Sequence, residues 1–539
     1  MWQQLYDPLN QSLLSALVAA APMVFFLLAL TVFRLKALTA AGITLVLSLV
    51  MALWLFGMPL QKAVMAALYG AANGLWPIGY IVLMAVWLYR IAVKSGKFEI
   101  IRASIATISE DQRIQVLLIA FCFGAFLEGA AGFGVPIAIC AALLVELGFK
   151  PIRAAMLCLV ANAAAGAYGA IGIPIIVGAQ QGGVTTSALA PMLIAILQLS
   201  TLFIPALLVM ILDGWRGLKQ TWPVVLMVGV LFSGSQALVL YLLGPELVDV
   251  VPPLLSMGAL ALFMRVWRPK HLYREPGAPP VNTTRWPLKA VLLAWSPFYI
   301  LTAIIMVWSL PAFRALFAPD GVLAATVLLL PIPGLHLQVQ ELPPIATAPH
   351  ALAALWKIEL VGAAGTAILL SVIVTTLTSK TLSLRQSLDQ LLSVVRELWR
   401  PLATICLVMA VAYVANFSGT SSTLGLALAE TGRVFPLISP VIGWLGVFIT
   451  GSVVNNNVLF AHLQAVTAGQ IGTSQALLVA ANTAGGVMAK VVSPQSIAIA
   501  AGAVGLVGHE SDIMRATLRY SLALLAYACL WTFVLSLLV

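Results

Sequence analysis

The chain has 539 residues, of which 62% are hydrophobic and 9% are charged. An average soluble domain is about a quarter charged, so this composition excludes an ordinary water-soluble fold and indicates a membrane protein. The formal net charge is +10, but the basic residues lie between apolar runs and form no single basic face, which argues against nucleic-acid binding.

Long apolar runs predict an all-α polytopic membrane protein. The runs 12–33, 37–57 and 223–243 contain no Lys, Arg, Asp or Glu, and the run 517–538 contains only Arg519. Since a membrane helix needs about 20 apolar residues, we expect about 12–14 transmembrane helices. Membrane-spanning strands alternate apolar and polar residues, whereas these runs are apolar on every face, so no strands are predicted.

The basic residues predict the orientation of the helices. Arg34 is the first Lys or Arg, so the positive-inside rule places the N-terminus outside and the basic loops inside, the richest being 265–289. Residues 310–360 contain few basic residues and are predicted to form a long external segment. The start, MWQQLYDPLN, lacks the basic region of a cleavable signal peptide.

Polar segments divide the chain. Residues 267–290 are rich in Pro and charge, and they predict a cytoplasmic linker between an N-terminal half, 1–266, and a C-terminal half, 291–539. Residues 380–400 have apolar positions at helical spacing and predict an interfacial helix on the cytoplasmic surface.

The two halves resemble each other in the order of their interruptions. Gly- or Asn-rich breaks at 127–136 and 450–458 are each followed by a turn and by a helix with an Asn and small residues, at 159–174 and 478–486. Matched interruptions of this kind indicate a binding site near the middle of the bilayer. The sequence therefore predicts pseudo-repeated halves with broken or re-entrant helices.

Glu128 is the one charged residue in the apolar run 116–145. A charge at mid-membrane costs about 2.5–3.5 kcal/mol or more, so this acid must be neutral, paired or in a cavity, which suits a proton carrier. The alternative is an acid near the membrane surface that caps a half-helix. Gly132 and Gly134 would permit a helix break whose free N–H groups attract a carboxylate, or else close helix packing.

Three consecutive asparagines, Asn455 to Asn457, follow Gly451 and Ser452 in the second half. Buried amides are costly unless they are hydrogen-bonded, and three adjacent residues cannot share one face of a helix. We therefore predict an unwound segment or hairpin tip that lines a cavity, with an extramembrane loop as the alternative.

Lys490 is the only Lys or Arg between Arg433 and Arg515. It could hold a substrate carboxylate, pair with Glu128, or extend its long side chain to the membrane interface. Ser493 and Gln495 belong to a further break, SPQS, that could line the path.

Motifs for other chemistry are missing from the sequence. There is no P-loop, HExxH or dinucleotide fingerprint, so we expect no ATP-driven engine, no enzyme, no cofactor and no metal site. The five cysteines lack CxxC spacing and are interpreted as small buried residues. A membrane enzyme would need ligands or catalytic pairs, and a sensor would usually carry a soluble domain. A passive channel remains open.

Five segments resemble the bacterial L-lactate permease family, which includes glycolate permeases: WQQLYDP at 2–8, FCFGAFLEGAAGFG at 121–134, DGWRG at 213–217, SGTSSTLGLALAETG at 418–432 and SPQSIAIA at 493–500. The resemblance implies a multi-pass protein of the bacterial cytoplasmic (inner) membrane that imports 2-hydroxymonocarboxylates with a proton. The chain has GSVVNNN at 451–457 where the family pattern is GSDTSSN, so Val453 replaces an acid. A second departure is NAAAG at 162–166, where the pattern is closer to NTAPV.

The combined prediction is a secondary active transporter, a proton symporter for L-lactate, D-lactate, glycolate or similar monocarboxylates. The alternatives are a divergent paralogue that moves another small organic anion and an uncoupled carboxylate channel. The expected partners are the anion, a proton and the lipid bilayer, and a homo-oligomer remains open. We expect Glu128 to carry the proton and the following residues to bind substrate: Gly132, Gly134, Asn162, Ser452, Asn455, Asn456, Asn457, Asn482, Lys490, Ser493 and Gln495.

Overall fold

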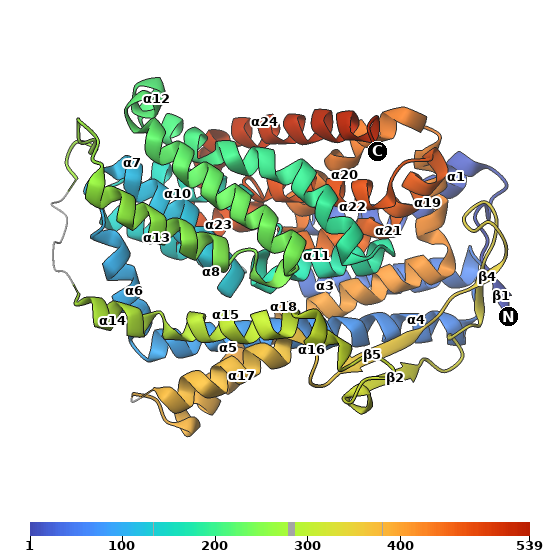
Figure 1. The fold of residues 1–539 in the computed structure, drawn as a ribbon. Coiled ribbons are helices and arrows are strands. Elements are labelled where there is room, and N and C mark those ends of the chain that lie inside the picture. Colours follow the sequence, from blue (N-terminus) through green and yellow to red (C-terminus); the bar gives the residue numbers. More distant parts are fainter. Residues whose placement is uncertain (133, 279–285, 380) are drawn as a thin grey trace.

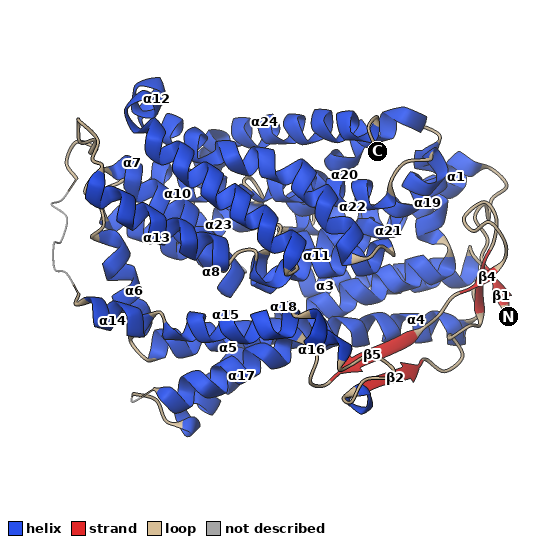
Figure 2. Ribbon diagram, in the orientation of Figure 1, coloured by secondary structure: helices blue, strands red, loops and turns tan. Residues whose placement is uncertain are grey.

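The computed structural model describes residues 1–132, 134–278, 286–379 and 381–539, and these residues are mostly helical (Figure 2). Ten helices are long and apolar enough to cross a membrane, or up to twelve if each bent pair is one span, within the described part of the chain. The polytopic all-α fold is therefore confirmed.

The helices of the first half follow one another with short connections. They are α1 (Ser12–Ala19), α2 (Ala21–Thr31), α3 (Ala37–Trp54), α4 (Leu60–Asn73), η1 (Gly74–Gly79), α5 (Tyr80–Lys94), α6 (Lys97–Ala106), α7 (Gln112–Gln115), η2 (Val116–Phe123), α8 (Gly124–Ala130), α9 (Val135–Glu146), α10 (Pro151–Ala161), η3 (Asn162–Ala164), α11 (Gly169–Gly182), α12 (Thr186–Leu242), η4 (Pro245–Leu247) and α13 (Val251–Val266).

The helices of the second half are interrupted by a segment with four short strands, between α16 and α17. They are α14 (Leu288–Ala294), α15 (Ser296–Ser309), α16 (Pro311–Ala315), η5 (Ala324–Thr326), α17 (Ala364–Thr378), α18 (Leu384–Ser418), α19 (Thr420–Ala429), η6 (Gly432–Val434), α20 (Phe435–Thr450), α21 (Val453–Ile471), α22 (Gln475–Lys490), α23 (Pro494–Ala503) and α24 (Glu510–Ser536).

The helix α12 folds back on itself at Gly214. This glycine has φ 64° and ψ −161°, which are not helical values. The Ser233 hydroxyl donates to the Gln198 carbonyl at 2.9 Å, so the two arms of α12 pack side by side. Counting the arms separately adds one span and brings the number into the expected range of about 12–14.

Short strands lie in the segment predicted to be external, where the sequence predicted none. β2 (Val327–Pro331) pairs antiparallel with β5 (Leu355–Glu359). β3 (Val339–Glu341) pairs parallel with β1 (Trp2–Gln3) and antiparallel with β4 (His350–Ala351). They lie near the N-terminus, at the end of the molecule opposite the turn of α12 (Figure 1). Pairing of the strands provides hydrogen bonds for backbone N–H and C=O groups that are not part of a helix.

The predicted interfacial helix at 380–400 is wrong as a separate element. Ser383 forms a capping box with Gln386, and α18 then continues through Pro401 to Ser418 without a break. Residues 384–400 are therefore the first part of the 35-residue helix α18, and residue 380 lies outside the described residues.

Residues His271 and Tyr273 are anchored by a buried group of charges, which we call the Arg113 cluster. The Arg113 guanidinium donates to Asp111 Oδ2 at 2.7 Å, Asp213 Oδ2 at 3.0 Å, Gln220 Oε1 at 2.7 Å and the His271 carbonyl at 2.6 Å. This cluster joins the α12 turn to the first part of the segment predicted as the linker 267–290, of which residues 279–285 lie outside the described residues.

The helix breaks predicted from glycine and asparagine are present. Among the described residues, α8 and α9 are separated around Gly132 and Gly134, both with positive φ, and α20 and α21 around Gly451, with φ +68°. Each pair is followed by a turn and a second break, between α10 and α11 and between α22 and α23. All residues of α8 and all of α22 except Gln475 are buried, so Glu128 and Lys490 lie in the interior of the fold.

Candidate functional site

Glu128 of α8 and Lys490 of α22 form an ion pair between the two halves. The Lys490 ammonium donates to Glu128 Oε1, and the Asn162 amide donates to Oε2 at 2.8 Å. Glu128 is 2% exposed and the Lys490 side chain 11% exposed. Pairing was one of three readings of Lys490 in the sequence, and it lets two charges occupy the interior.

Two glycines between α10 and α11 make room for this pair. A Cβ on Gly169 would lie 2.6 Å from Glu128 Oε1, and one on Gly166 would lie 3.2 Å from Lys490 Cδ. Any larger residue would push the carboxylate or the lysine stem out of place. Asn162 in this segment was predicted from the sequence, but the glycines were not, although they stand out in GAYGAIG.

The backbone beside Glu128 has a strained conformation. Ala170, Ile171 and Gly172 have φ values of 44°, 60° and 75°, in the left-handed region. Such a conformation costs of order 1–3 kcal/mol for a residue with a Cβ, and it persists at functional sites where the surroundings enforce it. The surroundings of Gly172 enforce its conformation, because the backbone packs closely against Pro245. A Cβ on Gly172 would lie 2.5 Å from the Pro245 carbonyl oxygen.

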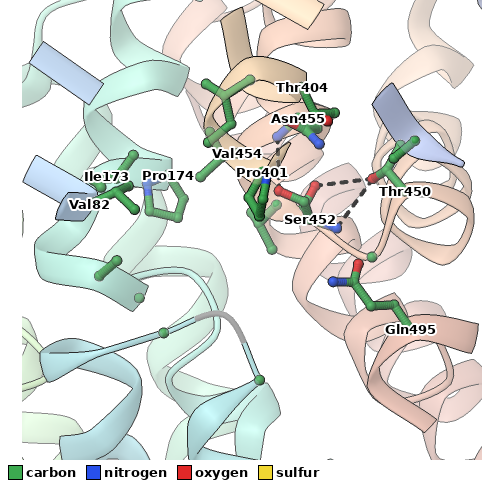
Figure 3. Close-up of a pocket in the computed structure, with 18 of the residues that line it drawn as sticks. Val82, Ile173, Pro174, Pro401, Thr404, Thr450, Ser452, Val454, Asn455 and Gln495 are labelled. Atoms are coloured by element: carbon green, nitrogen blue, oxygen red, sulfur yellow. Dashed lines mark hydrogen bonds between the residues drawn. The ribbon is translucent and has the colours of Figure 1, made fainter. Parts of the chain in front are cut away.

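A cavity of about 640 Å³, which we call the Glu128 cavity, borders the ion pair. Glu128 is the only acid among the described residues that line it. In Figure 3, Ile173, Pro174 and Val82 form one wall and Ser452, Thr450 and Gln495 lie opposite. Its exposed rim includes Lys36 and Arg400, two cations that favour the approach of an anion.

The start of α21 supplies polar groups to this cavity. Ser452 Oγ accepts from the Asn455 N–H at 3.2 Å and so caps the helix, while Thr450 Oγ1 accepts from the Ser452 N–H at 3.3 Å. The Oδ1 atom of Asn455 is buried and has no hydrogen-bond partner among the described residues. A helix N-terminus and a free amide oxygen together can bind a hydroxy acid.

Asn456 and Asn457 do not line the cavity, which corrects the prediction for the triplet. All three asparagines are in the first turns of α21, and these two are fully buried. Asn457 Nδ2 donates to the Pro174 carbonyl at 2.8 Å, and its Oδ1 accepts from Asn482 Nδ2 at 3.0 Å. Asn456 Nδ2 donates to the Asn482 carbonyl at 3.3 Å. These amides join α21 to α11 and α22, so they hold together helices that line the Glu128 cavity.

The remaining residues predicted to bind substrate also divide into those that line the Glu128 cavity and those that do not. Gly132, Gly134, Ser452, Lys490 and Gln495 line the cavity. Asn482 and Ser493 do not: Asn482 belongs to the amide group behind α21, and the Ser493 hydroxyl caps α23 by accepting from the Ser496 N–H at 3.3 Å. Asn162 reaches the cavity only through Glu128.

A second cavity, of about 1050 Å³, lies beside β2 and β5, and we call it the Glu246 cavity. Glu246 lines it and has an ion pair with Arg314 at 3.8 Å. The helix α11 separates the two cavities, because Ile173 and Pro174 line the first, whereas Ile176 and Gln180 line the second.

Membrane-length helices, two sets of matched breaks and an ion pair beside a central cavity define a polytopic membrane protein of the transporter class. A family model described as L-lactate permease matches residues 15–539. The chain belongs to the L-lactate permease family.

Three curated relatives show how much of the chain this likeness covers. The L-lactate permease of Halalkalibacterium halodurans is 47% identical over 541 residues, which cover 100% of both chains. That of Escherichia coli strain K12 is 47% identical over 97% of this chain and 96% of its own. The glycolate permease GlcA of the same strain is 45% identical over 97% of this chain and 95% of its own.

Proposed function

We propose that the chain is a secondary active transporter that moves small monocarboxylates, such as L-lactate, D-lactate or glycolate, with a proton across the bacterial cytoplasmic membrane. The family and the names of the relatives support the substrate class. The observation that carries the mechanism is the Glu128–Lys490 ion pair, which borders a cavity between two helix breaks.

The substrate carboxylate would compete with Glu128 for Lys490. Lys490 is the only buried cation that lines the cavity among the described residues, so a monocarboxylate entering it has one strong partner. The N-terminus of α21 adds a weaker attraction for the anion. Asn455 Oδ1, which has no partner, can accept from the hydroxyl group at C2 of the acid.

Exchange of partners at Lys490 couples the anion to a proton. When Lys490 turns to the substrate, Glu128 becomes a buried carboxylate without a cation, and such a charge is costly. Binding of one proton by Glu128 removes this cost. The site then has zero net charge both when empty, as Glu128⁻ with Lys490⁺, and when loaded, as Lys490⁺ with the anion and neutral Glu128. One proton therefore accompanies one anion.

Uptake of labelled L-lactate by proteoliposomes tests this proposal. We expect an inward proton gradient to drive accumulation by the wild type. Glu128→Gln, which imitates the protonated acid, should retain lactate–lactate exchange but lose gradient-driven accumulation by at least about tenfold. Glu110→Gln is the matched control, because Glu110 is exposed and lies away from the cavity.

Three results would contradict parts of the proposal. Wild-type accumulation that ignores the pH gradient would exclude proton coupling. Flux without saturable countertransport would indicate an uncoupled carboxylate channel. Competition by other short-chain acids would identify a different small organic anion as substrate. The division into halves, 1–266 and 291–539, stays a prediction.

A further inference from the structure

Asp249 is a second acid beside the ion pair, and the mechanism proposed so far does not use it. It lies between η4 and α13 and is 1% exposed. A Cβ on Gly129 would lie 2.7 Å from both the Cβ and the carbonyl oxygen of Asp249, so this turn packs directly against the residue that follows Glu128. Its position is fixed by a close backbone approach that only glycine permits.

Only one of the two oxygen atoms of the Asp249 carboxyl has a hydrogen-bond partner among the described residues. Its Oδ1 accepts from Gln236 Nε2 at 3.2 Å, whereas Oδ2 has no hydrogen-bond partner among the described residues. Gln236 Nε2 also donates to the Ala164 carbonyl at 3.2 Å, and its Oε1 accepts from Gln198 at 3.1 Å, so this amide has little capacity left. A buried carboxyl with one free oxygen has room for a proton on that oxygen.

Burial favours the neutral form of the Asp249 carboxyl, which has no ion-pair partner among the described residues. The titratable groups that face it are Glu128 on α8, Lys490 on α22 and Tyr168 beside α11. Two acids thus share a single cation, and the Lys490 ammonium is already bound to Glu128. An ionised Asp249 would be a buried charge without a partner, whereas one proton on Asp249 makes the whole group neutral.

Asp249 has neighbours that line each of the two cavities or adjoin a residue that does. Glu246 precedes it by three residues and lines the Glu246 cavity, while Glu128 lines the other cavity. Glu246 Oε2 is buried and, like Asp249 Oδ2, has no hydrogen-bond partner within the described chain. The Glu246 cavity lies beside β2 and β5, in the segment that the sequence predicts to be external. Asp249 therefore stands three residues after the acid of one cavity and packs against Gly129, which follows the acid of the other.

We propose that Asp249 is a proton-binding site that connects Glu246 with Glu128 and delivers the coupled proton from the Glu246 cavity. This inference rests on the proposed function. When Glu128 leaves Lys490, the proton on Asp249 Oδ2 moves to the Glu128 carboxylate, and Asp249 receives another proton through Glu246. Only O–H bonds break and form, and the total charge of the group rises by the one proton that enters with the anion.

Asp249→Asn tests the site because it imitates the protonated carboxyl permanently. In proteoliposomes we expect lactate–lactate exchange within about twofold of wild type, and gradient-driven accumulation reduced by at least about tenfold. Glu246→Gln should produce the same split more weakly, since that acid lies next to a cavity. Asp320→Asn is the matched control, because Asp320 is exposed and lines neither cavity.

Each outcome decides the matter. Wild-type accumulation by Asp249→Asn overturns the inference, and so does loss of exchange in a variant with a normal unfolding temperature, which would make Asp249 a substrate-binding residue. If Asp249→Asn does not fold, Glu246→Gln decides: its full gradient-driven accumulation overturns the route. A wild type that ignores the gradient would be seen before any variant is compared, and it would refute the proton coupling of the proposed function.

Discussion

The Arg113 cluster and the Glu128–Lys490 pair are both buried groups of charges that join distant parts of the chain, yet they differ in what surrounds them. Arg113 donates to two carboxylates, an amide and a carbonyl, and it lines neither cavity. The Glu128 carboxylate receives one amide and one ammonium, and both charged residues border open space.

This difference separates a structural cluster from an exchangeable one. All the strong partners of Arg113 are held by the fold, so no ligand can replace them without unfolding the linker region. Lys490 has one carboxylate partner and lies beside the Glu128 cavity, in which our proposal places the substrate carboxylate. A buried charge is therefore informative about transport only when a competing partner can reach it.

The largest expected effect is a loss of stability when the Arg113 cluster is disrupted. Arg113→Met should lower the free energy of unfolding by about 3–5 kcal/mol, because it leaves Asp111 buried without its cation. Thermal unfolding in detergent measures this loss. Molecules that do fold should exchange lactate within about twofold of wild type, and Asp111→Asn combined with Arg113→Met should recover part of the stability. An unchanged unfolding temperature would contradict the assignment.

Lys490→Met tests the exchangeable member. We expect lactate exchange to fall by about 100-fold, because the substrate carboxylate loses its buried cation. The double variant Glu128→Gln with Lys490→Met should restore the unfolding temperature without restoring exchange. Lys219→Met is the control, since Lys219 is exposed and outside both cavities. Normal exchange by Lys490→Met would refute the role of this lysine.

The smallest expected effect sharpens the same distinction within the asparagine triplet. Asn457→Ala removes buried hydrogen bonds to Pro174 and Asn482 and should cost about 1–3 kcal/mol of stability. Asn455→Ala should leave the unfolding temperature almost unchanged but raise the KM for lactate several-fold. Unfolding temperature and KM are measured for both variants. Equal changes in Asn455→Ala and Asn457→Ala would contradict the separate roles of these two asparagines.

Features with a local physical signal were predictable from sequence. The breaks near Gly132 and Gly451 follow from residues that permit positive φ, and Glu128 stands out because a lone acid in a long apolar run requires an explanation. The membrane helices follow from length and hydrophobicity alone.

Features that depend on long-range packing were not predictable. Asp249 lies just beyond an apolar run, where an acid usually indicates an exposed loop, and it is buried only because Gly129 lets its backbone approach. Asn456 and Asn457 resemble cavity-lining residues in sequence, but α11 and α22 use them as hydrogen-bond partners. The 380–400 segment is amphipathic, yet it continues into α18 because Pro401 does not break that helix.

The placement of α11 has one further consequence. The helix α11 lines both the Glu128 cavity and the Glu246 cavity, so a tilt of α11 that widened one cavity would narrow the other. The hydrogen bond from Asn457 to the Pro174 carbonyl ties α11 to α21, whose first residues line the Glu128 cavity. A movement of α11 would therefore pull on the start of α21 through this one amide.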